Sequence, residues 1–326
     1  MTAMQPLLSA SFKAMGVDVT VAGVGISPED VAKATHAARE AAEQWESMFS
    51  RFRPDSELSR LNGANGAATA VSSQFLAVVD LVVAGVRESD GRFNPAILPA
   101  LERAGYDRSF ETIGGSAEQE RSPRPLPIDA GWVDEVVMDR STSRISIPAG
   151  IRLDFGGIAK GAYVDAVTAR LQQWPGGYVD AGGDLRVWGA APDGATWRAG
   201  IQDPDDPHRN LTHIALGVPE MCAVATSGTY RRKWRQGAVD ANHLIDPQSG
   251  RPLNERILSV TVVAGSVADA EIETKSLMVA GSRELPMILR RGGAAWVLTG
   301  SGTFEVLVNE THTARLSPSH NIRAAA

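Results

Sequence analysis

The chain has 326 residues, 43% of them hydrophobic and 21% charged, as expected for an ordinary globular protein with one large or two modest domains. Its formal net charge of -6 argues against general binding to nucleic acids or anionic membranes, because both favour a basic surface. The single cysteine cannot form an intrachain disulfide and gives no support to a thiolate metal site. The amino-terminal residues resemble neither a signal peptide nor a lipid anchor, and no stretch of about 18 apolar residues is present. We therefore expect a cytoplasmic location, no nucleic-acid partner and no stable membrane insertion.

The first 130 residues are expected to be rich in helices. Ser27 followed by Pro28 predicts a helix start, because serine caps the first turn and proline fits the first helical position. Apolar residues then recur at helical spacing up to Met48. The other expected elements of this part are a half-buried strand after Gly16 within residues 11–22, a helix over 73–88, a helix from Asn94 and Pro95, and a polar, mobile surface loop over 114–127.

After Trp132 the pattern changes to short β-like segments, with helical patterns at about 158–173 and 268–281. Early helices followed by many strands at hairpin-like spacing indicate an α+β fold, with largely antiparallel sheets and packed helices. We expect a helix-rich part over 1–130 and a sheet-rich part over 131–326, packed intimately as one unit. The expected strands lie near 133–138, 144–148, 151–155, 177–181, 185–189, 196–201, 213–217, 222–226, 258–264, 294–299 and 303–309.

The most informative motif is the run Leu-Asp-Phe-Gly-Gly-Ile-Ala-Lys-Gly, from Leu153 to Gly161. Glycines allow a ligand to come close to the backbone, and a helix that starts directly after them offers unpaired N–H groups to an anion. Asp154 and Lys160 bracket this turn with opposite charges, so we expect both to matter for ligand binding and not for folding. Taken alone, such a turn is also typical of an ordinary strand-to-helix crossover.

This run and several other segments, in the same order along the chain, resemble the ApbE-type FAD:protein FMN transferases. The resemblance extends from about Phe12 to about Gly281. The other segments are Ala14-Met-Gly16, Ser50-Arg-Phe-Arg-Pro-Asp-Ser-Glu-Leu-Ser-Arg-Leu-Asn62, Gly91-Arg-Phe-Asn-Pro95, Asp180-Ala-Gly-Gly-Asp184, Ala225-Thr-Ser-Gly-Thr-Tyr230 and His243-Leu-Ile-Asp-Pro-Gln-Ser-Gly250.

The resemblance implies an ApbE-like fold in which FAD binds between the two parts of the chain. Phe52 stands where the family has an aromatic ring against the isoalloxazine, and Asn94 stands where it has an aspartate. Both also have a plain structural interpretation, Phe52 as a core residue and Asn94 as a helix cap. The residues that the resemblance implies as FAD contacts are Met15, Gly16, Phe52, Phe93, Asn94, Asp154, Lys160, Thr226, Ser227, His243 and Ile245.

The resemblance also implies Mg²⁺, held by a backbone carbonyl of the glycine turn, which we assign to Ala159, and by an aspartate and a threonine four residues apart on a helix. The preferred alignment places Glu271 and Lys275 at those two positions, whereas an alternative alignment uses Asp269 and leaves Thr274 one residue out of phase. A lysine is not a metal ligand. Either its ammonium replaces the ion beside a pyrophosphate, or the pair is a surface ion pair worth about 0.2–0.5 kcal/mol and the metal site is lost.

The activity that the resemblance implies is transfer of FMN from FAD to a Ser or Thr hydroxyl of an acceptor protein, with release of AMP. Phosphoryl transfer requires mainly positioning and charge neutralisation. The candidate proton acceptors are Asp154 and His243, and Lys275 or a metal would neutralise charge. Two alternatives stay open: hydrolysis of FAD to FMN and AMP, and an FAD-binding protein with a degenerate metal site and no turnover.

Overall fold

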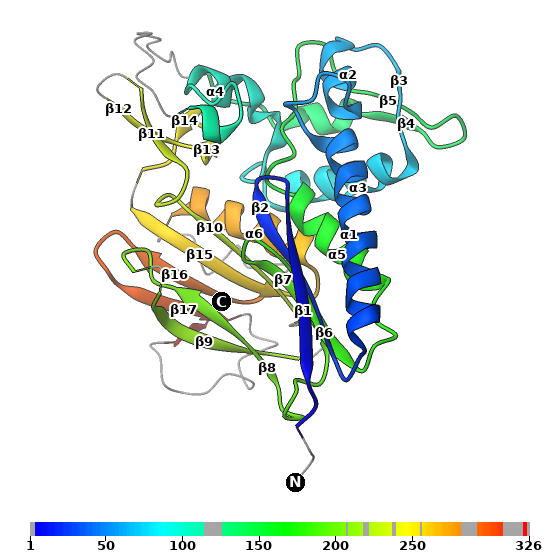
Figure 1. Cartoon of the computed structure of the whole chain (residues 1–326). Helices are drawn as coiled ribbons and strands as arrows, with labels where there is room; N and C mark the ends of the chain where they lie inside the picture. The colour runs from blue at the N-terminus through cyan, green and yellow to red at the C-terminus, as the bar shows by residue number, and fades with distance from the viewer. Residues whose placement is uncertain are drawn as a thin grey trace.

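The computed structural model describes residues 4–113, 126–206, 208–217, 222–236, 239–254, 256–281, 292–308 and 322–324. In this part of the chain, nine strands form one central sheet, in which every neighbouring pair is antiparallel except the parallel pair β17 and β18 (Figure 1). In spatial order, the strands are β1 (Leu7–Ala14), β2 (Val17–Val24), β6 (Gly176–Ala181), β7 (Asp184–Gly189), β10 (Ala223–Gly228), β15 (Ile257–Ala264), β16 (Gly292–Thr299), β17 (Phe304–Val308) and β18 (Ile322–Ala324).

Helices cover one face of this sheet, and a hairpin covers part of the other. The helices are α1 (Pro28–Phe49), α5 (Ala159–Ala169) and α6 (Val267–Ala280), and the hairpin is formed by β8 (Trp197–Gln202) and β9 (Asn210–Leu216). Consecutive residues of β15 face the two layers: Val262 packs in the core with the helices, and Val263 packs in the core that contains Trp197 and Ile214. Burial on both faces explains why β15 is apolar almost throughout.

A third group of elements lies beyond one end of the central sheet (Figure 1). It contains α2 (Glu57–Gly63), α3 (Ser73–Glu88), α4 (Leu98–Arg103), the short helical turns Pro95–Ile97, Phe110–Thr112 and Gly131–Glu135, and the short strands β3 (Thr69–Ala70), β4 (Val137–Asp139), β5 (Arg144–Ser146), β11 (Lys233–Gln236), β12 (Val239–Asn242), β13 (Ile245–Asp246) and β14 (Arg251–Pro252). None of the helices in the described ranges is long and apolar enough to cross a membrane.

The architecture confirms the predicted α+β fold and several of its helices. The helix expected over 73–88 has these bounds, and α1 begins at Pro28 after Ser27, whose Oγ accepts a hydrogen bond from the N–H of Asp30 (3.1 Å). The helix expected from Asn94 starts as a 3₁₀ turn, and the Asn94 side chain caps it by accepting from the N–H of Ala96 (3.0 Å). Of the loop expected over 114–127, residues 114–125 lie outside the described ranges.

The strand expected after Gly16 is confirmed as β2, and the residues before Met15 form β1, so the segment is a hairpin. β1 and β2 pair along their whole length and are joined at Met15 and Gly16, which have φ values of 52° and 69°. Two central residues with positive φ match the right-handed twist of the flanking strands. Gly16 adopts this conformation freely, whereas a residue with a side chain such as Met15 rarely does. The hairpin also places residues 7–24 in the same sheet as strands from the second half of the chain.

The prediction of a strand over 151–155 was wrong, since this segment is irregular. Its backbone groups are satisfied by a side chain from elsewhere in the chain. The Asn62 side chain accepts from the N–H of Leu153 (2.7 Å) and donates to its carbonyl oxygen (2.8 Å). The amide therefore takes the place of a neighbouring strand. The segment expected as a strand over 133–138 is a helical turn, Gly131–Glu135, followed by β4.

Candidate functional site

A cavity of about 540 Å³ lies between the end of the central sheet and the elements beyond it. The β1–β2 and β6–β7 turns line one wall of the cavity. They are joined by a hydrogen bond from the N–H of Gly182 to the carbonyl oxygen of Asp18 (3.0 Å). Every residue that the sequence predicted for the site lines this cavity: Met15, Gly16, Phe52, Phe93, Asn94, Asp154, Ala159, Lys160, Thr226, Ser227, His243, Ile245, Glu271 and Lys275. The structure thus brings all of them together, while their individual roles stay predictions.

One end of the cavity is aromatic and is organised by Arg51. The Arg51 guanidinium lies over the rings of Phe52 (4.2 Å to the centroid) and Tyr106 (4.5 Å). It also donates to the carbonyl oxygen of Tyr106 (2.8 Å) and forms an ion pair with Asp154 (Nε to Oδ2, 2.6 Å). Phe52 is 42% exposed, so it is not a core residue, and its ring is available to a ligand at the cavity.

Sequence reasoning missed Arg51 and Tyr106. Arg51 lies within the segment from Ser50 to Asn62 that carries the family resemblance, so its charge next to Phe52 was a usable signal. Tyr106 reaches the cavity from the segment after α4, and nothing in its local sequence indicates this.

Asp154 and Lys160, which bracket the glycine turn, have separate partners. Asp154 is held by Arg51 and by the N–H of Gly156, which donates to Oδ1 (2.9 Å). Lys160 instead pairs with Asp184 and Glu271. The expectation that Lys160 matters for the ligand and not for folding therefore changes, because this ammonium compensates two buried carboxylates.

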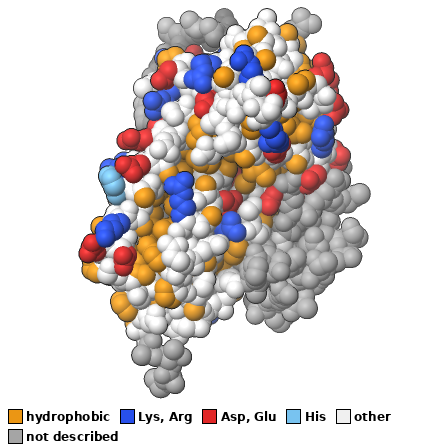
Figure 2. All heavy atoms as spheres, turned by 90° about the vertical axis from the view of Figure 1, so that its right-hand side faces the viewer, with side chains coloured by type: hydrophobic (Ala, Val, Ile, Leu, Met, Phe, Trp, Pro, Cys, Tyr) orange, Lys and Arg blue, Asp and Glu red, His pale blue; other side chains and the backbone are white. Residues whose placement is uncertain are grey.

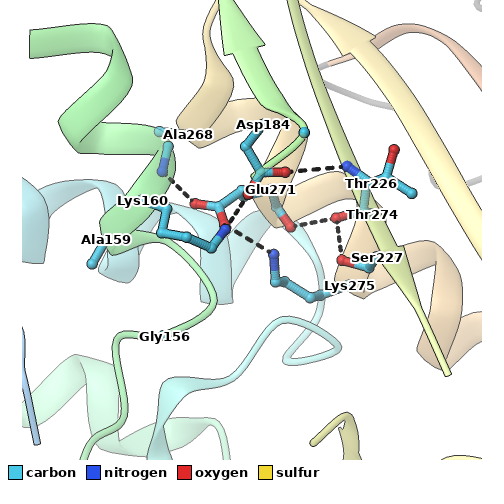
Figure 3. Close-up of polar contacts among 12 residues, drawn as sticks. Gly156, Ala159, Lys160, Asp184, Thr226, Ser227, Ala268, Glu271, Thr274 and Lys275 are labelled. Carbon is cyan, nitrogen blue, oxygen red and sulfur yellow. Dashed lines mark hydrogen bonds and ion pairs between the residues drawn. The ribbon is translucent and has the colours of Figure 1, made fainter. Parts of the chain in front are cut away.

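A second part of the cavity lining, the charged end, is a cluster of four charged side chains, Lys160, Asp184, Glu271 and Lys275 (Figure 3). The Lys160 ammonium contacts Asp184 and lies 3.0 Å from Oε1 of Glu271, and Lys275 Nζ lies 3.5 Å from the same oxygen. The second oxygen of Glu271 accepts from the N–H of Gly161 (2.7 Å). The carboxylates are nearly inaccessible, with 8% and 1% of the side-chain surface exposed, whereas each lysine keeps 19%.

Burial and neighbouring opposite charges shift the pKa values of this cluster in opposite directions. Burial alone would lower the pKa of Lys160, but attraction to Asp184 and Glu271 raises it above the ordinary lysine value. Burial would likewise raise the pKa of Glu271, but Lys160 and Lys275 hold it below its ordinary value. For Lys275 burial prevails over the attraction of Glu271 and lowers the pKa.

Thr226 and Ser227 are engaged within the protein. The Thr226 hydroxyl is 2.8 Å from that of Thr261 on the neighbouring strand, and the Ser227 hydroxyl is 2.8 Å from that of Thr274 on α6. The N–H of Thr226 donates to Oδ1 of Asp184 (3.3 Å), which connects β10 to the charged cluster. These contacts fix the wall of the cavity at its charged end.

His243 is the uncharged group at this end. Its Nδ1 is inaccessible and has no hydrogen-bond partner among the described residues. Burial, together with the nearby positive charges of Arg232, Lys275 and Lys160, lowers the pKa of His243 to about 3. The imidazole is therefore neutral near pH 7.

The residues present do not fit the magnesium site that the resemblance implies. The carbonyl oxygen of Ala159 accepts from Nε1 of Trp45 (2.8 Å), and both oxygens of Glu271 are engaged as described above. Asp269, the ligand of the alternative alignment, accepts from the Ser266 hydroxyl at the start of α6 (2.6 Å). Across the described ranges, no group of three or more His, Cys, Asp or Glu side chains could hold a metal ion.

The fold and the cavity define a protein of the ApbE class. A sequence model of the ApbE family matches residues 15–298, so the chain belongs to the ApbE family. The chain is 33% identical to the FAD:protein FMN transferase of Vibrio cholerae over 242 residues, covering 73% of this chain and 71% of that protein. It is 28% identical to the FAD:protein FMN transferase of Salmonella typhimurium over 297 residues, covering 87% and 81%.

Solved structures agree with this assignment. The flavin transferase ApbE from Vibrio cholerae superimposes with a TM-score of 0.75 at 25% identity, covering 96% of this chain and all of that one. The ApbE protein of Thermotoga maritima gives a TM-score of 0.78 at 23% identity, covering 95% and 99%, and supports the fold.

Proposed function

We infer that the protein is an FAD:protein FMN transferase, which moves FMN from FAD to a Ser or Thr hydroxyl of an acceptor protein and releases AMP. The observation that carries this inference is that an exposed aromatic ring, Phe52, and two ammonium groups, Lys160 and Lys275, line one cavity. Such a cavity suits a ligand with a flat ring system and a pyrophosphate. The relatives named above carry the same activity in their names, which favours transfer over hydrolysis or binding alone.

The chemistry assigns roles to the residues of the charged end. The acceptor oxygen attacks the phosphorus on the FMN side of the pyrophosphate, the bond from that phosphorus to the bridging oxygen breaks, and AMP leaves. His243 is our preferred acceptor for the hydroxyl proton, because its imidazole is neutral near pH 7 and the residue lines the cavity. Asp154 is less suited, since both of its oxygens are engaged by Arg51 and Gly156. The ammonium of Lys275 would stabilise the charge on the departing phosphate.

The direct test is to incubate the purified protein with FAD, with and without a flavin-acceptor domain, and to measure AMP and the mass of the acceptor. A transferase releases one AMP for each acceptor that gains an FMN phosphoester. Release of AMP and FMN without an acceptor would instead identify a hydrolase, and bound FAD without AMP would identify a binding protein. The cytoplasmic location stays a prediction.

A further inference from the structure

The charged end of the cavity is built around Lys275 in the place where a metal ligand was expected. Its stem lies against the glycine turn: a β-carbon added at Gly157 would be only 3.0 Å from Cε of Lys275. One at Gly161 would be 2.7 Å from Oε2 of Glu271, so this glycine is required for the approach of α6 to α5. The two glycines therefore make room for Glu271 and Lys275, as well as for a ligand.

The charges along the cavity are balanced for a dianion without an added metal. Among the described residues, six arginines or lysines and four aspartates or glutamates line it, an excess of two positive charges in a protein whose net charge is -6. Over the face that carries α1 and α3, by contrast, acidic and basic side chains are interspersed (Figure 2). The pyrophosphate of FAD carries about two negative charges, one for each diester-like phosphate. His243, neutral near pH 7, leaves this balance unchanged.

We propose that this protein binds FAD and transfers its FMN without a divalent cation, because the Lys275 ammonium, placed beside Glu271, supplies the charge next to the pyrophosphate. The proposal rests on the proposed function and specifies how that site neutralises the charge of its substrate. An ammonium is a compact point charge that can donate to phosphate oxygens. The oxygens that would have to ligate a metal already accept from Lys160, Gly161 and Trp45.

The test compares FAD with riboflavin, which has the ring and no phosphate, by flavin fluorescence titration in EDTA and in MgCl₂. The wild-type protein should bind FAD equally in both buffers, within about twofold. Lys275→Met should weaken FAD binding in EDTA by about tenfold or more, the loss of one charge-assisted contact, and leave riboflavin binding unchanged. The matched control is Lys33→Met on the exposed side of α1, where the lysine pairs with Glu29, and it should change neither affinity.

Two further variants cover the case in which Lys275→Met unfolds the protein. Lys275→Arg keeps the charge and should retain FAD binding in EDTA. Glu271→Asp combined with Lys275→Thr provides hard oxygen ligands at i and i+4 and should make FAD affinity and AMP release rise with MgCl₂.

Binding of FAD by the wild type only in MgCl₂ would overturn the proposal and leave the transferase assignment intact. Equal FAD affinity of wild type and Lys275→Met would overturn it as well. A wild type that binds FAD in neither buffer would remove both the proposal and the proposed function.

Discussion

The two ends of the cavity are built in opposite ways. At the charged end Glu271 is fully inaccessible and is surrounded by protein partners, whereas at the aromatic end Phe52 is 42% exposed. A buried ion pair that loses one partner leaves an uncompensated charge inside the protein, while an exposed ring contributes little to folding. The charged end is therefore part of the folded core as well as of the site, and the aromatic end contributes mainly to ligand binding.

The largest expected effect on stability comes from Lys160→Met at the charged end. The change leaves Asp184 and Glu271 without their nearest cation, so the free energy of unfolding of the apoprotein should fall by about 3–5 kcal/mol. Chemical denaturation followed by circular dichroism measures this. The control Lys33→Met removes an exposed charge and should change stability by no more than about 0.5 kcal/mol. Adding Glu271→Gln to Lys160→Met should recover part of the loss, and an unchanged stability of Lys160→Met would show that the cluster is not structural.

Arg51→Met tests the buried part of the aromatic end, because this guanidinium contacts both Phe52 and Asp154. Its side chain is 6% exposed, and its loss should cost about 1.5–3 kcal/mol in stability, the range for hydrogen bonds to charged groups. FAD affinity should fall as well, since the Phe52 ring loses its support. Arg51→Lys should rescue little, because an ammonium has no planar face to contact both rings while it donates to Asp154. Full rescue by lysine would mean that only the charge matters.

Phe52→Ala should weaken FAD binding without lowering the stability of the protein. FAD affinity should fall by about 1–3 kcal/mol, as for aromatic stacking on a base, whereas the melting temperature of the apoprotein stays the same. Phe52→Tyr keeps the ring and is the matched control. Parallel flavin fluorescence titrations and thermal melts separate the two effects. Unchanged FAD affinity in the alanine variant would remove Phe52 from the site.

The difference between local and long-range contacts explains what could be predicted from the sequence. Local signals sufficed where local contacts decide: Ser72 caps α3 through the N–H of Phe75, three residues away, and the helix has the predicted bounds. The family motifs identified the lining of the cavity, because each motif carries its own residues to one place.

Long-range partners were beyond such reasoning. Lys160 meets Glu271, which lies 111 residues further along the chain, and Leu153 is satisfied by Asn62, 91 residues earlier. The local sequence indicates neither the buried ion pairs nor the irregular segment over 151–155. A lysine or an apolar run has the same sequence pattern whatever it contacts in the fold. Positive φ at Met15 was equally hidden, since methionine is no turn signal.

The smallest predicted effect concerns His243, the neutral group of the charged end. Its folded-state pKa of about 3 lies below the unfolded value of about 6.5, so between these pH values the unfolded chain binds the extra proton. Stability should therefore be unaffected by this residue above about pH 6.5 and should decrease as the pH falls below it, by at most about 1.4 kcal/mol for each pH unit. In His243→Gln this contribution is absent, so its unfolding free energy should decline less between pH 7 and pH 5 than that of the wild type, with all other titrating groups in common. Parallel curves for the two proteins would mean that His243 titrates alike in the folded and unfolded states, and the case for a neutral base beside the two lysines would fail.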